Sequence, residues 1–164
     1  GQISLVPYRK VRPMAANAPF SSVMLLVDGT DAAVRAADYA IDLCRFAAAR
    51  LIAVAVVDTE TLRNLLSSRI MVEAEMKEFE AELRLSFEKH LRNVQQAASD
   101  RNVTAQTVLL KGSTHSAVLE EIRRRKPDLL VMAGYSSSLL KRDLAARERQ
   151  LVLDEATLPV LLVR

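Results

Sequence analysis

Apolar and polar residues alternate between two patterns along this chain of 164 residues. Short, continuous apolar runs stand between longer segments whose apolar residues recur every three or four positions. Continuous apolar runs of this length are typical of strands that are buried on both faces of a parallel sheet. The runs therefore predict five strands, at residues 22–27, 51–57, 103–110, 129–132 and 160–163.

The segments between these runs predict amphipathic helices. After the first strand, Val34, Ala37, Ile41, Cys44 and Ala48 share one helical face, and Thr30 or Asp31 can cap the first turn. A polar-rich helical region covers residues 60–98, and Ser67-Ser68 is expected to divide it into a short and a long helix. Two further helices are predicted, one from Ser113 to the stop at Pro127 and one at residues 139–156.

Strands that alternate with helices favour an α/β three-layer sandwich, with parallel strands joined by right-handed crossovers. The run at 103–110 alternates more than the others, so it is expected nearer an edge of the sheet. Residues 1–20 contain three of the five prolines and no clean period. They predict an extended N-terminal arm, and residues 21–164 predict a single domain.

Three pieces of the chain resemble the universal stress protein (UspA-like) family. They are residues 23–31, Lys111-Gly-Ser113 followed by Pro127–Met132, and Ala156–Arg164. The likeness covers nearly everything from Ser22 to Arg164. The resemblance implies the adenine nucleotide alpha hydrolase-like fold, with five parallel strands in the order 3-2-1-4-5 and the first and fourth strands central.

ATP-binding members of that family carry a glycine motif after the fourth strand: Gly, two residues, Gly, nine residues, Gly, then Ser or Thr. Laid on this chain without a gap, the motif falls on Ala133, Ser136, Ala146 and Arg147. Moved by one residue, it falls on Gly134, Ser137, Arg147 and Glu148. Glycine lets a backbone approach phosphate oxygens and aim its N–H groups at them. Since neither alignment recovers the motif, the resemblance implies a branch that does not bind ATP in the usual way.

A vestigial or modified nucleotide site is expected around Asp28, Val57, Gly134, Ser136, Ser137 and Arg147. Asp28 stands where family members place an acid that contacts adenine or ribose, and its alternative role is to cap the turn into the first helix. The serines can cup an anion or cap a helix. Arg147 can contact a phosphate or lie on a solvated helix face.

Composition narrows the classes of function. The net charge of +3 comes without a concentrated basic face, and Arg123–Lys126 suits a helix C-terminus, so no nucleic acid is expected. No His, Cys, Asp or Glu cluster has metal-ligand spacing, and no catalytic grouping can be proposed, so an enzyme is not expected. One cysteine, no secretory signal and no apolar run of roughly 20 residues favour a cytoplasmic protein without a membrane span.

The last strand, at the sheet edge in this order, is apolar and carries no protective charge. We therefore expect a homodimer through residues 158–164, with Leu158, Val160 and Leu162 in the contact. The leading hypothesis is a non-catalytic, dimeric stress-response or signalling module with an unknown protein partner and no cofactor. The alternative is a sensor that holds ATP or AMP in a modified pocket. An ATP hydrolase is a weaker third reading because no Mg²⁺ ligand or base is evident.

Overall fold

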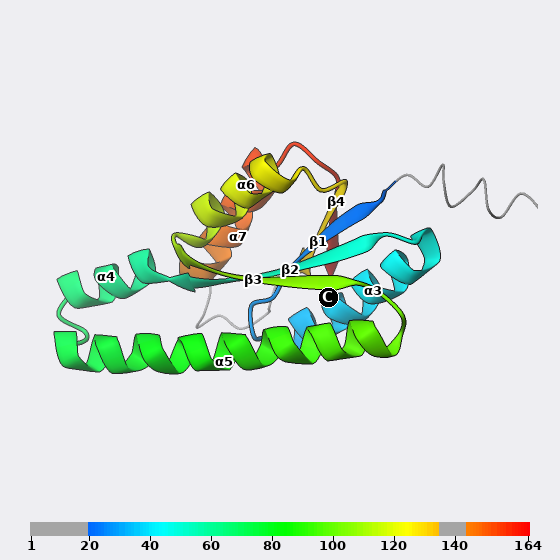
Figure 1. Ribbon diagram of the computed structural model, residues 1–164. Coiled ribbons are helices and arrows are strands. Elements are labelled where there is room, and N and C mark those ends of the chain that lie inside the picture. Colours follow the sequence, from blue (N-terminus) through cyan, green and yellow to red (C-terminus); the bar gives the residue numbers. More distant parts are fainter. Residues whose placement is uncertain (1–19, 135–143) are drawn as a thin grey trace, which may run out of the picture.

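A computed structural model describes residues 20–134 and 144–164 of the chain. Within them, five parallel strands form one sheet in the order β3-β2-β1-β4-β5 (Figure 1). The strands are β1 (Ser22–Leu26), β2 (Arg50–Asp58), β3 (Ala105–Gly112), β4 (Leu129–Ala133) and β5 (Val160–Val163). The predicted α/β fold and strand order are thereby confirmed.

Helices cover both faces of this sheet. One layer contains α3 (Asp31–Ala47) and α5 (Glu73–Asp100), and the other contains α6 (Thr114–Arg125) and α7 (Leu144–Glu155). The short helix α4 (Thr59–Ser67) follows β2 and extends from the end of the sheet beside the first half of α5 (Figure 1). Ser68 ends α4, so the predicted division of the long helical region at Ser67-Ser68 is confirmed.

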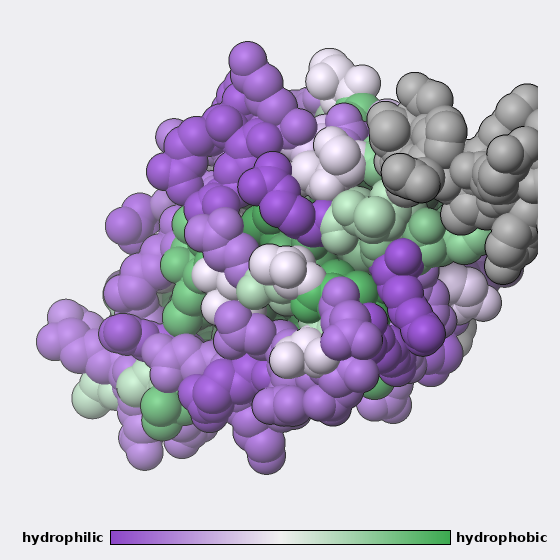
Figure 2. Space-filling model, turned by 45° about the vertical axis from the view of Figure 1, so that its right-hand side comes forward, coloured by the Kyte–Doolittle hydropathy of each residue, from purple (hydrophilic) through white to green (hydrophobic). Residues whose placement is uncertain are grey.

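The core divides between the two faces because successive side chains of a strand point to opposite sides. Val23 and Leu25 of β1 pack toward α3 and α5, whereas Met24 and Leu26 pack toward α6 and α7. All four are buried. Figure 2 shows apolar and neutral residues in the middle of the visible face, with hydrophilic residues around them.

The third strand differs from the prediction of residues 103–110. It starts at Ala105 and continues through Lys111 and Gly112, which the sequence analysis had placed after its end. The reason is pairing: β2 extends to Asp58, and its last residues Val57 and Asp58 face Lys111 and Gly112. The neighbouring strand therefore sets the length of β3 more than the local composition does.

Asp128 joins the starts of the two central strands. Its carboxylate accepts hydrogen bonds from the backbone N–H of Ser21 at 2.7 Å, the backbone N–H of Ser22 at 2.9 Å and the Ser21 hydroxyl at 3.1 Å. The backbone N–H of Asp128 in turn donates to the Ser22 carbonyl at 2.8 Å. The backbone hydrogen bond from Ser21 is the largest cause that lowers the pKa of Asp128, and the bonds from the Ser22 backbone and the Ser21 hydroxyl lower it further, against the opposing effect of burial.

Candidate functional site

The candidate site lies at the carboxyl ends of β1 and β2, next to the point between β1 and β4 where the strand order reverses. Open α/β sheets usually bind ligands in this position. A cavity of about 230 Å³ opens there between the strand ends, α4, α5 and the start of α7. We call it the Asp28 cavity, since Asp28 follows β1 directly and lines it.

Apolar side chains make up most of the walls of the Asp28 cavity. Leu26 and Val56 come from the strands, and Leu62 of α4 is buried beneath them. Phe79, Leu83 and Phe87 of α5 close the outer side; they follow one another at four-residue steps along one helical face. The volume is below the roughly 300–1,000 Å³ of sites that hold drug-sized ligands. The cavity has the size for a base-like group.

Asp28 itself is engaged with the chain that follows it. Its Oδ1 accepts hydrogen bonds from the backbone N–H of Thr30 at 3.0 Å and from the Thr30 hydroxyl at 2.6 Å. Thr30 is the N-cap of α3 and accepts from the backbone N–H of Ala33 at 3.1 Å. Asp28 thus fixes the cap residue rather than capping the helix directly. Its Oδ2 lies 3.9 Å from a guanidinium nitrogen of Arg149.

Asp58 is the equivalent residue at the end of β2, and the sequence analysis did not select it. Its Oδ1 accepts from the backbone N–H of Thr61 at 2.9 Å and caps α4. Its Oδ2 accepts from the hydroxyl of Thr114 at 2.8 Å and from the backbone N–H of Thr114 at 3.2 Å, at the start of α6. The sequence held the signal, since Asp58 directly follows an apolar run as Asp28 does.

Glu148 and Arg149 bring α7 to the same cavity. Glu148 is largely buried and pairs with the imidazole Nδ1 of His115 at the start of α6. Among the described residues, the ionisable side chains that line the cavity are three carboxylates, Asp28, Asp58 and Glu148, and one guanidinium, Arg149. The described part of the cavity lining is therefore more acidic than basic.

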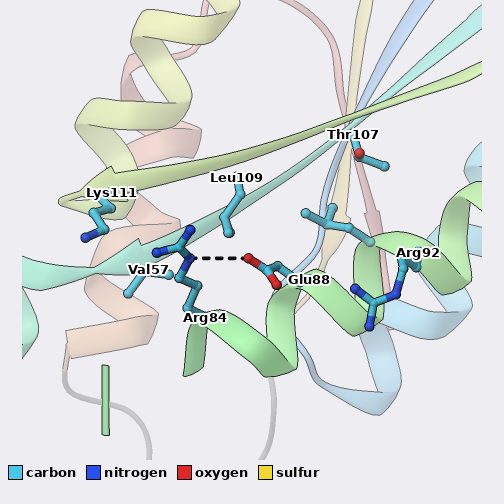
Figure 3. Close-up of a pocket in the computed structure, with 8 residues that line it drawn as sticks. Val57, Arg84, Glu88, Arg92, Thr107, Leu109 and Lys111 are labelled. Carbon is cyan, nitrogen blue, oxygen red and sulfur yellow. Dashed lines mark hydrogen bonds and ion pairs between the residues drawn. The ribbon is translucent and has the colours of Figure 1, made fainter. Parts of the chain in front are cut away.

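Val57 and Arg147, two other predicted site residues that the structure describes, do not line the Asp28 cavity. The side chain of Val57 points to the opposite face of the sheet from Val56 and lines a second groove, between β3 and α5 (Figure 3). Arg147 is exposed and lies in an open groove with Ser113, Ser116 and His115. Ser136 and Ser137, together with Ser138 and Lys141, lie outside the described residues.

Three further motif positions can be placed in the fold. Ala133 is buried in β4, where it pairs with Val163 of β5. Ala146 is 6% exposed near the start of α7, so its methyl group occupies packed space. Gly134 donates its N–H to the carbonyl of Val163 at 2.7 Å, and a Cβ there would make only ordinary contacts, 3.5 Å or more away. Ala133 and Ala146 therefore carry methyl groups in packed surroundings, and the N–H of Gly134 is already bonded to Val163.

The polar groups of the site are satisfied within the chain. Among the described residues, no buried side-chain nitrogen or oxygen lacks a hydrogen-bond partner. The same residues contain no group of three or more His, Cys, Asp or Glu side chains that could hold a metal ion.

Two remaining sequence expectations concern Cys44 and the basic cluster at the end of α6. Cys44 is buried among apolar side chains, and burial raises the pKa of its thiol to about 12, which makes it an unreactive core residue as expected. Arg123, Arg124 and Arg125 lie in the last turn of α6, where positive charge is favourable. Within the described residues, none of the helices combines the length and the apolar character needed to cross a bilayer.

Comparisons with known proteins identify the fold and the family. The universal stress protein family matches residues 19–164. Universal stress protein MJ0531 of Methanocaldococcus jannaschii is 26% identical over 145 residues, covering 88% of this chain and 82% of that protein. Universal stress protein YxiE of Bacillus subtilis is 26% identical over 150 residues, covering 88% of this chain and 99% of that protein.

Solved structures share the fold at lower sequence identity. UspA from Lactobacillus plantarum superposes with a TM-score of 0.70 at 20% identity, over 88% of this chain and 98% of its own. A universal stress protein in complex with cAMP superposes with a TM-score of 0.63 at 20% identity, over 88% of this chain and 97% of its own. The universal stress protein from Archaeoglobus fulgidus in complex with dAMP superposes with a TM-score of 0.58 at 11% identity, over 88% of this chain and 98% of its own. With a family match that spans most of its length, this chain belongs to the universal stress protein family.

Proposed function

We propose that this protein is a dimeric, non-catalytic interaction module of stress response or signalling, which does not bind ATP in the manner usual for its family. The observation that carries the proposal is the acidic rim of the Asp28 cavity. Within the part of the chain that the structure describes, a triphosphate at this cavity would approach three carboxylates and one guanidinium. The buried methyl groups of Ala133 and Ala146 support the same conclusion.

Dimerisation is proposed through residues 158–164. The support is the position of β5 at the sheet edge, where it pairs with β4 on one side, and the 45% exposure of Leu162. An apolar edge strand of this kind is prone to pair with another chain. We propose a cytoplasmic location, in keeping with a single cysteine that has no second one to pair with.

Isothermal titration calorimetry tests the nucleotide part of this proposal. ATP, ADP, AMP, cAMP and cyclic dinucleotides are each expected to give no saturable heat in the micromolar range, because phosphates meet the acidic rim. The universal stress protein known in complex with cAMP serves as the positive control for cAMP under the same conditions. Saturable micromolar binding of ATP to this protein would refute the proposal.

A second candidate function is an adenine-nucleotide sensor with a modified pocket. It is favoured by the cavity beside Asp28 and by the cAMP and dAMP complexes of proteins with the same fold. Mass spectrometry of ligand extracted from the purified protein distinguishes the two candidates. A co-purifying adenine compound whose binding is lost in Asp28→Ala supports the sensor. Protein that purifies free of nucleotide and ignores added adenosine supports the interaction module.

A further inference from the structure

The groove between β3 and α5 has the geometry to receive an extended strand. It is an open groove of about 570 Å³ on the side of the sheet away from β5 (Figure 3). Thr107, Leu109 and Lys111 of β3 line one side, and Arg84, Glu88 and Arg92 of α5 line the other. Among the described residues β3 pairs with β2 alone, so β3 is an edge strand.

The same three residues of β3 carry the free backbone groups of the edge. Leu51 of β2 donates its N–H to the carbonyl of Thr104, so in a parallel ladder the even-numbered residues of β3 direct their N–H and C=O groups to β2. The odd-numbered residues must then direct theirs outward. The side-chain amide of Gln95 bonds the carbonyl of Ala105 at 3.3 Å from outside the sheet, in agreement with this assignment. The outward backbone groups of Thr107, Leu109 and Lys111 therefore face the groove.

The wall along α5 is a stripe of charge at four-residue steps. Arg84 bonds Glu88 at 3.2 Å, and Lys111 pairs with Glu80 at 3.2 Å. Arg92 is exposed and takes part in no ion pair among the described residues. The side chains of Arg84 and Lys111 are 60% and 62% exposed, so their ion pairs contribute at most about 1 kcal/mol and can exchange partners readily.

The spacing of the arginines matches the repeat of a strand. Eight helical residues separate Arg84 from Arg92, which corresponds to about 12 Å along α5. Four residues of an extended chain span about 13 Å, and residues four apart in a strand project on the same side. The residue midway between them would lie over Leu109, beside Val57 and Leu91 on the floor of the groove. The groove thus suits an acidic residue, an apolar residue and an acidic residue at alternate positions.

We propose that this groove docks an extended acidic segment of a partner protein, which adds a strand to β3. The carboxylate at position i of the segment contacts Arg92, and the carboxylate at position i+4 contacts both Arg84 and Lys111. Main-chain hydrogen bonds to the outward groups of β3 supply affinity, and alternate side chains supply specificity. This inference rests on the proposed function, because it specifies which kind of partner the proposed interaction module would bind.

Titration with a synthetic peptide tests the docking. The probe is a capped nine-residue peptide of threonines with glutamate at positions three and seven and valine at position five. We expect saturable binding that weakens with salt, and binding about fivefold or more weaker to Arg92→Glu. Lys77→Glu is the matched control: Lys77 lies on α5, is 76% exposed and is outside the groove, so affinity should be unchanged. Equal binding of a peptide with glutamine in place of both glutamates would overturn the proposal.

Amide hydrogen exchange tests the geometry separately. In the free protein, the amides of Val108 and Leu110 should exchange slowly and those of Thr107, Leu109 and Lys111 quickly. Saturating probe peptide should slow the latter three by at least about tenfold, since each free-energy gain of 1.4 kcal/mol in protection is a factor of ten. Unchanged exchange at these amides would overturn strand addition. If the peptide does not bind, but the protein is dimeric and does not bind ATP, this inference is wrong and the proposed function is still supported.

Discussion

Leu162→Asp is expected to convert the protein from a dimer to a monomer. Leu162 is on the edge strand β5, with its side chain 45% exposed, and the proposed two-fold contact would bury it in both protomers. In the proposed contact, the substitution would remove apolar contact and would place two carboxylates close together. If each copy costs at least about 1.4 kcal/mol, the dimer dissociation constant rises about a hundredfold or more.

Sedimentation equilibrium or light scattering at micromolar concentration measures this change. Ile70→Asp is the control, since Ile70 is 69% exposed, lies in the turn after α4 and undergoes the same apolar-to-acidic change. It should leave the mass at that of a dimer. Circular dichroism of both variants checks that the fold persists. A Leu162→Asp protein that keeps the dimer mass would show that the protomers meet elsewhere.

Asp128→Ala is expected to destabilise the fold by about 1–3 kcal/mol at neutral pH. The carboxylate satisfies two backbone N–H groups and a hydroxyl at the start of β1, and removal leaves the N–H of the buried Ser22 without that acceptor. Urea unfolding followed by circular dichroism gives the free energy of unfolding. The exposed Glu78→Ala on α5 removes one carboxylate without this network and should change stability by less than about 0.5 kcal/mol.

The effect of Asp128 should depend on pH in a defined direction. The pKa of Asp128 is lowered in the folded protein, by the hydrogen bond from the Ser21 backbone first. The ionised form therefore stabilises the fold above the unfolded-state pKa of about 3.9, and this contribution is lost as pH falls through the lower folded-state value. The stability difference between wild type and Asp128→Ala should be constant from pH 6 to 8, at about its full size, and shrink below about pH 4. A difference that grows on acidification would contradict this assignment.

Local patterns in the sequence carried enough information for the fold. The continuous apolar runs of β1, β2 and β4 reflect burial on both faces, which depends little on context once a parallel sheet forms. The break between α4 and α5 was equally predictable, because Ser67-Ser68 is a local signal for the end of a helix. The burial of Cys44 was predictable because its spacing places it on the apolar face of α3. The end of β3 was not, because β2 rather than β3 determines where the pairing stops.

The candidate site was only partly predictable. Asp28 was selected, since it follows the first strand and matches the position of an acid in the family. Asp58 carries the same signal and was missed, whereas Val57 was selected although Val56 lines the cavity. Neighbouring residues of a strand point to opposite faces of the sheet. A family alignment that is uncertain by one residue therefore cannot tell whether Val56 or Val57 lines the cavity.

The sequence by itself determined the order and type of the elements, the apolar core and the family likeness. Only the tertiary structure decided that Asp58, Glu148 and Arg149 meet at the cavity of Asp28, and that the arginines of α5 stand beside the free edge of β3. The physical reason is that periodicity and propensity act within about one turn or strand of the chain, whereas a site is assembled by crossovers that bring residues tens of positions apart into contact.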